Sequence, residues 1–108
     1  MISMTKGDTE SIAIRAVNPR TGEPIPFEEG DTVFFTVKFT ESSERVLFQK
    51  RITEFEDGAA VVAIFPEDTK PLEVGKYRYD GQLTDRFGNV YTIVKPSDFV
   101  VTGEVTWD

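Results

Sequence analysis

The sequence predicts an all-β fold, an antiparallel β-sandwich of about seven strands. Two observations lead to this prediction. Apolar and polar residues alternate along most of the chain, with turn signals between the alternating segments, and no segment sustains a helical spacing of apolar residues. The chain has 108 residues, which suits one domain, so we expect residues 1–108 to form a single domain.

The N-terminal half contains two alternating segments. Residues 12–17 are predicted to form a strand, and residues 18–26 a loop whose three prolines favour an extended, solvated path. Residues 32–40 form the strongest predicted strand. Its inner face is expected to carry Val33, Phe35, Val37 and Phe39.

A second long strand is predicted at residues 45–55, with Val46, Phe48 and Ile52 in phase. Lys50 is a charged residue within this otherwise apolar series, so we expect its ammonium group to reach solvent at a sheet edge. The pair Asp57-Gly58 predicts a hairpin turn in which the glycine has a positive φ.

Residues 59–65 are small and apolar on both faces, which suits a strand between two neighbours. Residues 66–72 begin with proline and carry two acids early, so they are predicted to form one α-helical or 3₁₀ turn.

The C-terminal part is predicted to form a strand at residues 76–84, a turn at residues 85–89 and a strand at residues 90–94. Lys95 and Pro96 are expected to interrupt the sheet before a last strand at residues 97–107.

One local pattern favours an immunoglobulin-like sandwich. Leu72, Gly75 and Tyr77 form Leu-x-x-Gly-x-Tyr just before a strand, as in the corner where a tyrosine hydroxyl bonds back to upstream backbone. The alternative is that Tyr77 is a core aromatic with its hydroxyl at the rim. Residues that share a phase within the strands are expected to be mostly buried: Phe35, Val37, Phe48, Ile64, Tyr79, Leu83, Phe99 and Val101.

Composition excludes several classes of function. The chain has no cysteine and no histidine, which removes disulfides, thiol nucleophiles and imidazole-based triads. Its net charge of −7 argues against nucleic acid and anionic membranes as partners. The N-terminus lacks the basic start and apolar stretch of a signal peptide, so we expect synthesis in a cytoplasm.

The acidic clusters at residues 28–31, 54–57 and 67–68 lie in predicted loops or turns. Acid–base catalysis needs a buried carboxylate, and calcium needs oxygens that converge on one ion, so we read these clusters as solvated turn residues. The serines lack a nucleophile elbow, and the glycines form no phosphate loop. We therefore expect no catalytic residue, no metal, no cofactor and no small-molecule substrate.

Aromatic residues near loops and chain ends are the candidate contact residues. Phe27, Phe87 and Trp107 are the predicted interface residues, since exposed aromatics anchor protein interfaces. The predicted contact regions are the proline-rich loop at residues 18–27 and the C-terminal strand. For Trp107, the alternative is that it folds back over the open end of the sandwich.

A series of motifs in this order resembles a known family. The residues that carry the resemblance are Lys6-Gly7-Asp8-Thr9, Gly30-Asp31-Thr32-Val33-Phe34-Phe35-Thr36-Val37-Lys38, Phe55, Asp57-Gly58, Ile64-Phe65-Pro66, Asp68-Thr69, Leu72, Gly75, Tyr77-Arg78-Tyr79-Asp80, Gly88, Tyr91-Thr92-Ile93, Pro96, Phe99 and Glu104-Val105-Thr106. The chain is similar to small β-sandwich proteins of phages and prophages of Gram-positive bacteria. In particular, it resembles the N-terminal domain of the baseplate upper protein family.

This resemblance implies an immunoglobulin-like fold, no catalysis, and assembly into a virion tail or baseplate. The implied partners are other virion protein subunits or further copies of the chain itself. The implied location is the host cytoplasm and then the virion tail. Baseplate upper proteins continue into helical and receptor-facing regions, whereas this chain ends at Asp108, so a short structural or adaptor subunit is expected. The alternative function is a carbohydrate-binding or adhesion module of bacterial surface type.

Overall fold

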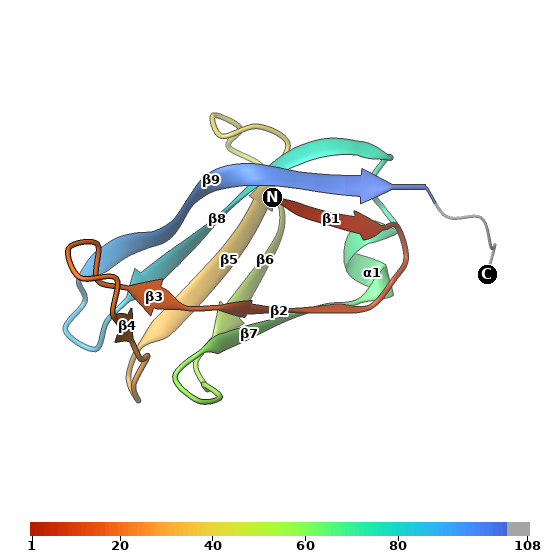
Figure 1. Ribbon diagram of the computed structural model, residues 1–108. Coiled ribbons are helices and arrows are strands. Elements are labelled where there is room, and N and C mark those ends of the chain that lie inside the picture. The colour runs from red at the N-terminus through yellow and green to blue at the C-terminus, as the bar shows by residue number, and fades with distance from the viewer. Residues whose placement is uncertain (104–108) are drawn as a thin grey trace.

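The computed structural model describes residues 1–103 and shows two packed β-layers (Figure 1). Its elements in chain order are β1 (Ile2–Thr5), β2 (Glu10–Ile14), β3 (Ala16–Val17), β4 (Pro24–Ile25), β5 (Thr32–Lys38), β6 (Val46–Ile52), β7 (Ala60–Ile64), α1 (Pro66–Thr69), β8 (Gly75–Thr84) and β9 (Val90–Thr102). The predicted all-β sandwich is confirmed, with α1 as the single helical turn among residues 1–103. In that same range, no helix is long and apolar enough to cross a membrane.

The larger layer is a five-stranded sheet with the order β1-β9-β8-β5-β6. The second layer is the antiparallel pair β2 and β7, and β3 and β4 form a short hairpin at one end of the molecule (Figure 1). Two details differ from the prediction. β1 pairs parallel with β9, so the sandwich is antiparallel except at this edge. Within residues 1–103, β7 pairs with β2 alone, so it is not a strand between two neighbours.

The core lies between the two layers and is centred on Phe35. The Phe35 ring lies 5.3 Å from the Tyr79 ring and 6.4 Å from the Phe99 ring, measured between centroids. Burial is confirmed for five of the predicted core residues, which are at most 1% exposed: Phe35, Val37, Ile64, Phe99 and Val101. Phe48, Tyr79 and Leu83 are only partly buried, because they pack against the margin of this core.

A β-bulge changes the predicted faces at the beginning of β6. Val37 lies opposite Phe48, but Lys38 lies opposite Val46, so β6 contains one extra residue at this point. An extra residue reverses the alternation of side chains between the two faces. As a result, Val46 lies opposite the outward-facing Lys38 and is 42% exposed, so its predicted inward orientation is wrong. Phe39 follows the end of β5, which has no extra residue, and its ring meets the ring of the buried Tyr77, so it keeps the predicted face. Phe39 is nevertheless 64% exposed, because it lies at the margin of the core.

A second irregularity lets β9 pass the predicted interruption at Lys95 and Pro96. Tyr79 lies opposite Ser97 and Gly81 lies opposite Val94, so the pairing shifts around the proline. Proline has no N–H to donate to the neighbouring strand. At a bulge one residue is left unpaired, so the strand continues past the proline without that hydrogen bond. The predicted interruption is therefore wrong, and β9 is continuous from Val90 to Thr102.

The tyrosine corner predicted at the start of β8 is confirmed. The Tyr77 hydroxyl donates a hydrogen bond of 2.6 Å to the carbonyl oxygen of Glu73. Tyr77 is 5% exposed, and Leu72 is also buried. The hydroxyl thereby ties the loop between α1 and β8 to the core, as in immunoglobulin-like sandwiches.

We expect Tyr77→Phe to lower the free energy of unfolding by about 1–2 kcal/mol, because the Glu73 carbonyl loses its donor in a half-buried site. Urea denaturation of the two proteins measures this loss. Tyr91→Phe is the matched control, since Tyr91 is 52% exposed. Equal stabilities of the Tyr77 and Tyr91 variants would show that the corner bond adds nothing.

Candidate functional site

The three predicted interface residues have different environments. Phe27 is 5% exposed, and its ring packs against Phe55 at 5.2 Å between centroids. Its predicted interface role is wrong, because a ring that fills the core offers no surface to a partner. Phe87 is 79% exposed. Trp107 lies outside the described residues.

Phe87 lies at the tip of the β8–β9 hairpin, which hydrogen bonds hold in a defined shape. The Asp85 carboxylate accepts hydrogen bonds of 2.9 Å from the backbone N–H groups of Phe87 and Asn89. These hydrogen bonds, together with the one from the Asn89 side chain, outweigh the effect of burial and lower the pKa of Asp85. The Arg86 guanidinium lies 5.4 Å from the centre of the Phe87 ring and donates to Glu28 at 3.0 Å.

Two more large apolar side chains on this hairpin are exposed. Val90 is 60% exposed and Tyr91 is 52% exposed. Together with Phe87, they define what we call the hairpin surface: Phe87, Val90 and Tyr91. Three large apolar side chains are thus exposed within five residues of one hairpin, and exposed apolar side chains that gather in one place are typical of contact surfaces.

The predicted proline-rich contact region is more ordered than a loop. Residues 18–23 connect β3 and β4, in which Ala16 lies opposite Ile25 and Val17 opposite Pro24. Val17 and Ile25 are 57% and 47% exposed, so this hairpin also presents apolar atoms to solvent.

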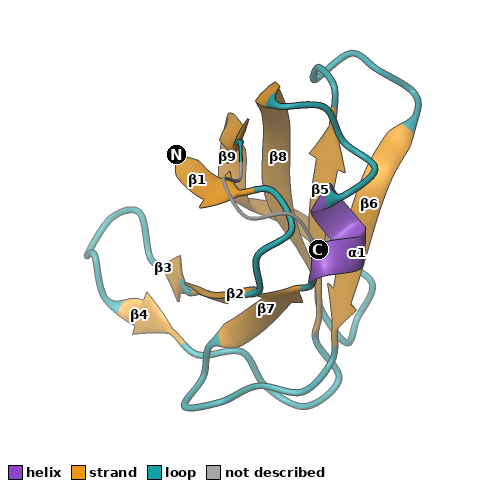
Figure 2. Ribbon diagram, turned by 90° about the vertical axis from the view of Figure 1, so that its right-hand side faces the viewer, coloured by secondary structure: helices purple, strands orange, loops and turns teal. Residues whose placement is uncertain are grey.

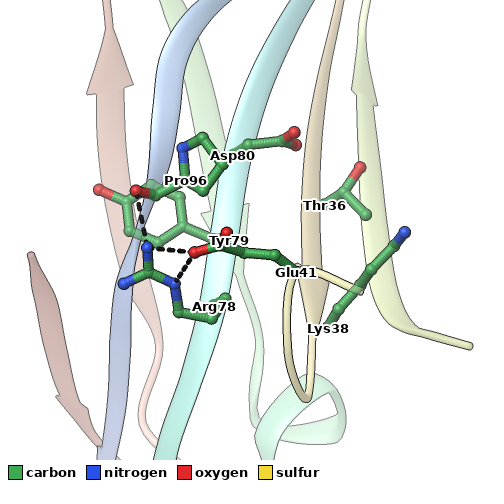
Figure 3. A pocket seen from close by; sticks show the side chains of 7 residues that line it. All are labelled: Thr36, Lys38, Glu41, Arg78, Tyr79, Asp80 and Pro96. Atoms are coloured by element: carbon green, nitrogen blue, oxygen red, sulfur yellow. Dashed lines mark hydrogen bonds and ion pairs between the residues drawn. The ribbon is translucent and has the colours of Figure 1, made fainter. Parts of the chain in front are cut away.

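A polar hollow of about 70 Å³ lies on the outer face of the larger sheet (Figure 3). Arg78 on β8 forms its wall, and its guanidinium donates to the Asp98 carboxylate at 2.6 Å, to Glu41 at 2.8 Å and to the Pro96 carbonyl at 3.0 Å. This arrangement ties β8 to β9 and to the loop after β5. The hollow is far smaller than the roughly 300 Å³ of a typical ligand pocket, so we assign Arg78 a structural role.

The same hollow contains a carboxyl group with a shifted pKa. Burial raises the pKa of Asp80, and the nearby Lys38 ammonium opposes that rise. Figure 3 shows Asp80 and Lys38 at the rim, apart from the ion pair of Arg78 and Glu41. A raised pKa at one carboxyl does not make a catalytic pair, which also needs a second acid in reach.

The acidic clusters mostly behave as the sequence predicts, with one exception. Glu28 is exposed and pairs with Arg86, and Asp31 accepts a hydrogen bond from the Glu28 backbone. Asp68 is the exception. Its side chain is 13% exposed and lies 2.7 Å from the Lys50 ammonium, so Lys50 crosses from β6 to α1. Among residues 1–103, no group of three acids is placed to hold a metal ion.

We expect the Arg78–Asp98 pair to make stability sensitive to acid. The hydrogen bond from Arg78 lowers the pKa of Asp98 in the folded protein. The unfolded chain therefore takes up the proton first, and this contribution to stability is present above about pH 4 and is lost as the pH falls through the folded pKa.

Asp98→Asn is thus expected to reduce stability at neutral pH, and the difference from the original chain is expected to shrink between about pH 5 and pH 2. Thermal unfolding across this pH range measures it, with the exposed Glu44→Gln as the control. A difference that stays constant with pH would contradict the assigned shift.

Comparison of the chain with models of known protein families and with curated proteins found no match.

Proposed function

We propose that this chain is a non-enzymatic structural or adaptor component of a phage or prophage tail or baseplate, acting through protein–protein contacts. The observation that carries the contact role is the hairpin surface of Phe87, Val90 and Tyr91, which presents large apolar side chains on a turn held by Asp85. The virion assignment is supported by the resemblance of motifs along the chain, which include the confirmed tyrosine corner.

The chemistry of the hairpin surface indicates how a partner would bind. Phe87 and Tyr91 are rigid aromatic side chains that lose little conformational entropy when they are buried, so they are suited to act as anchors. Arg86 beside Phe87 offers a guanidinium that can donate to a partner once it leaves Glu28. We expect the partners to be other virion subunits, with synthesis in the host cytoplasm before assembly.

The same two rings support the alternative function of carbohydrate binding. Aromatic faces stack on sugars, and Phe87 and Tyr91 are both exposed on one hairpin. A sugar site also needs polar groups that fix the orientation of the ring hydroxyls. Asp85 and Asn89 already bond to each other in the turn, so the hairpin favours a protein partner.

The test is the double variant Phe87→Ser and Tyr91→Ser, introduced into the phage that encodes the chain. We expect incorporation into tails to fall about thirtyfold, the loss typical of an interface hot spot, while thermal stability changes little, because both rings are exposed. Val46→Ser is the control, since Val46 is also exposed but lies on β6, outside both predicted contact regions.

Normal incorporation of the double variant would overturn the role of the hairpin surface. Loss of binding to cell-wall polysaccharide with normal incorporation would instead support the carbohydrate alternative.

A further inference from the structure

The two layers of the sandwich are unequal, with five strands in one sheet and two in the other. Figure 2 shows α1 next to β6, where the chain continues from β7. The inner face at the beginning of β6 is therefore covered by α1 and the loop that follows it, not by another strand. Side chains leave a groove of about 420 Å³ at this place.

The floor of this groove is apolar. It is formed by five side chains, and we call it the β6–α1 groove: Phe39, Leu47, Phe48, Leu72 and Tyr77. Phe39 is 64% exposed, and its ring meets the Tyr77 ring edge-on at 5.8 Å between centroids. The groove thus offers apolar surface to solvent at the end of the molecule opposite the hairpin surface.

The two walls of the groove carry opposite charges. Glu67 of α1 and Glu73 of the following loop are exposed on one side, and Arg45 is exposed on the β6 side. Asp68 also lines the groove, but Lys50 neutralises it at 2.7 Å. The α1 wall is therefore negative over an apolar floor, and the β6 wall bears one positive charge.

We infer that the β6–α1 groove binds a segment of a different protein that carries a large apolar side chain with lysine or arginine beside it. The apolar side chain would cover Phe39 and Leu47, and the basic group would face Glu67 and Glu73, because complementary charges fix the orientation of a bound segment. A second copy of this chain is a poor occupant, since each copy has a net charge of −7. This inference does not depend on the virion assignment or on the hairpin surface.

The test uses the full chain and fluorescein-labelled short peptides in which a central leucine, phenylalanine or tryptophan is flanked by lysines. A matched set has glutamates in place of the lysines. Fluorescence anisotropy measures the dissociation constant of each peptide. We expect saturable binding of the lysine set and weaker binding of the glutamate set.

Charge reversal gives a signed prediction. Glu67→Lys with Glu73→Lys is expected to weaken binding of the lysine peptides about tenfold or more, and Arg45→Glu to tighten it about threefold. Phe39→Ser is expected to weaken both peptide sets, because it removes apolar floor. The control is Glu23→Lys with Glu29→Lys, which changes the net charge equally at exposed residues outside the groove lining and is expected to change binding less than about twofold.

Three results would each overturn the inference. These are no saturable binding of any lysine peptide, equal affinity for the glutamate peptides, and equal loss of binding in the control pair. The two groove glutamates, the two control glutamates, Arg45 and Phe39 are all exposed. Thermal unfolding is therefore expected to show that every variant is folded.

Discussion

Replacing Phe35 with alanine is expected to lower the free energy of unfolding by about 3–5 kcal/mol, the largest loss from any single truncation proposed for this chain. Phe35 is 0% exposed, and its ring contacts the rings of Phe48, Tyr79 and Phe99. Truncation removes these contacts and leaves a cavity that the two sheets cannot close, because their backbones are fixed by hydrogen bonds.

Guanidinium denaturation measures this loss, and Phe87→Ala is the control. Phe87 is 79% exposed, so its truncation is expected to cost less than about 0.5 kcal/mol. A loss below about 1 kcal/mol for Phe35→Ala would contradict the central position of this ring.

The second large effect is expected from Gly58→Val in the turn before β7. Gly58 has a φ of +75°, and a Cβ built on it would lie 2.7 Å from the Cβ of Pro26. The left-handed backbone costs about 1–2 kcal/mol for a residue with a side chain, and the clash adds to it, for an expected total of about 2–4 kcal/mol.

Gly88→Val separates the two causes. Gly88 has a φ of +87°, but a Cβ built on it would meet no atom within 4 Å. We expect this variant to lower the free energy of unfolding only by the cost of the left-handed backbone, about 1–2 kcal/mol. Equal losses of unfolding free energy for the two variants in parallel urea titrations would contradict this. They would show that Pro26 shifts away from the new side chain at little energetic cost.

Features set by residues close in sequence were predictable. The alternation within β5 places Phe35 and Val37 in the core, and the Asp57-Gly58 turn has the predicted positive φ. Lys50 lies on an edge strand, as predicted, but its ammonium pairs with Asp68 instead of reaching solvent, and its side chain is 23% exposed. The pattern before Tyr77 predicts a bond to a residue only four positions away.

Features set by distant residues were not predictable. Phe27 lies in a stretch rich in proline and glutamate that reads as a solvated loop, yet its backbone N–H donates to the carbonyl of Gly58 and its ring packs on Phe55. β1 is a strand because it pairs with the other end of the chain, Ile2 opposite Phe99. Neither contact leaves a periodic signal in the local sequence.

The candidate surfaces were only partly predictable for the same reason. Phe87 is exposed, as a turn aromatic is expected to be. Tyr91 lies opposite the half-buried Leu83, so alternation alone predicts a buried ring, and its exposure depends on how far β8 and β9 extend along the sandwich. The β6–α1 groove results from the unequal sheets, which leave Phe39 exposed just past the end of β5.

The most direct test of the proposed function is quantitative mass spectrometry of tails purified from the phage or prophage that encodes this chain. We expect the chain to sediment with tail proteins at a fixed ratio across the density gradient, and this ratio to fall for the Phe87 and Tyr91 double variant. Purified, infectious phage particles whose tails contain none of the chain would contradict the proposal that it is a structural component of the virion.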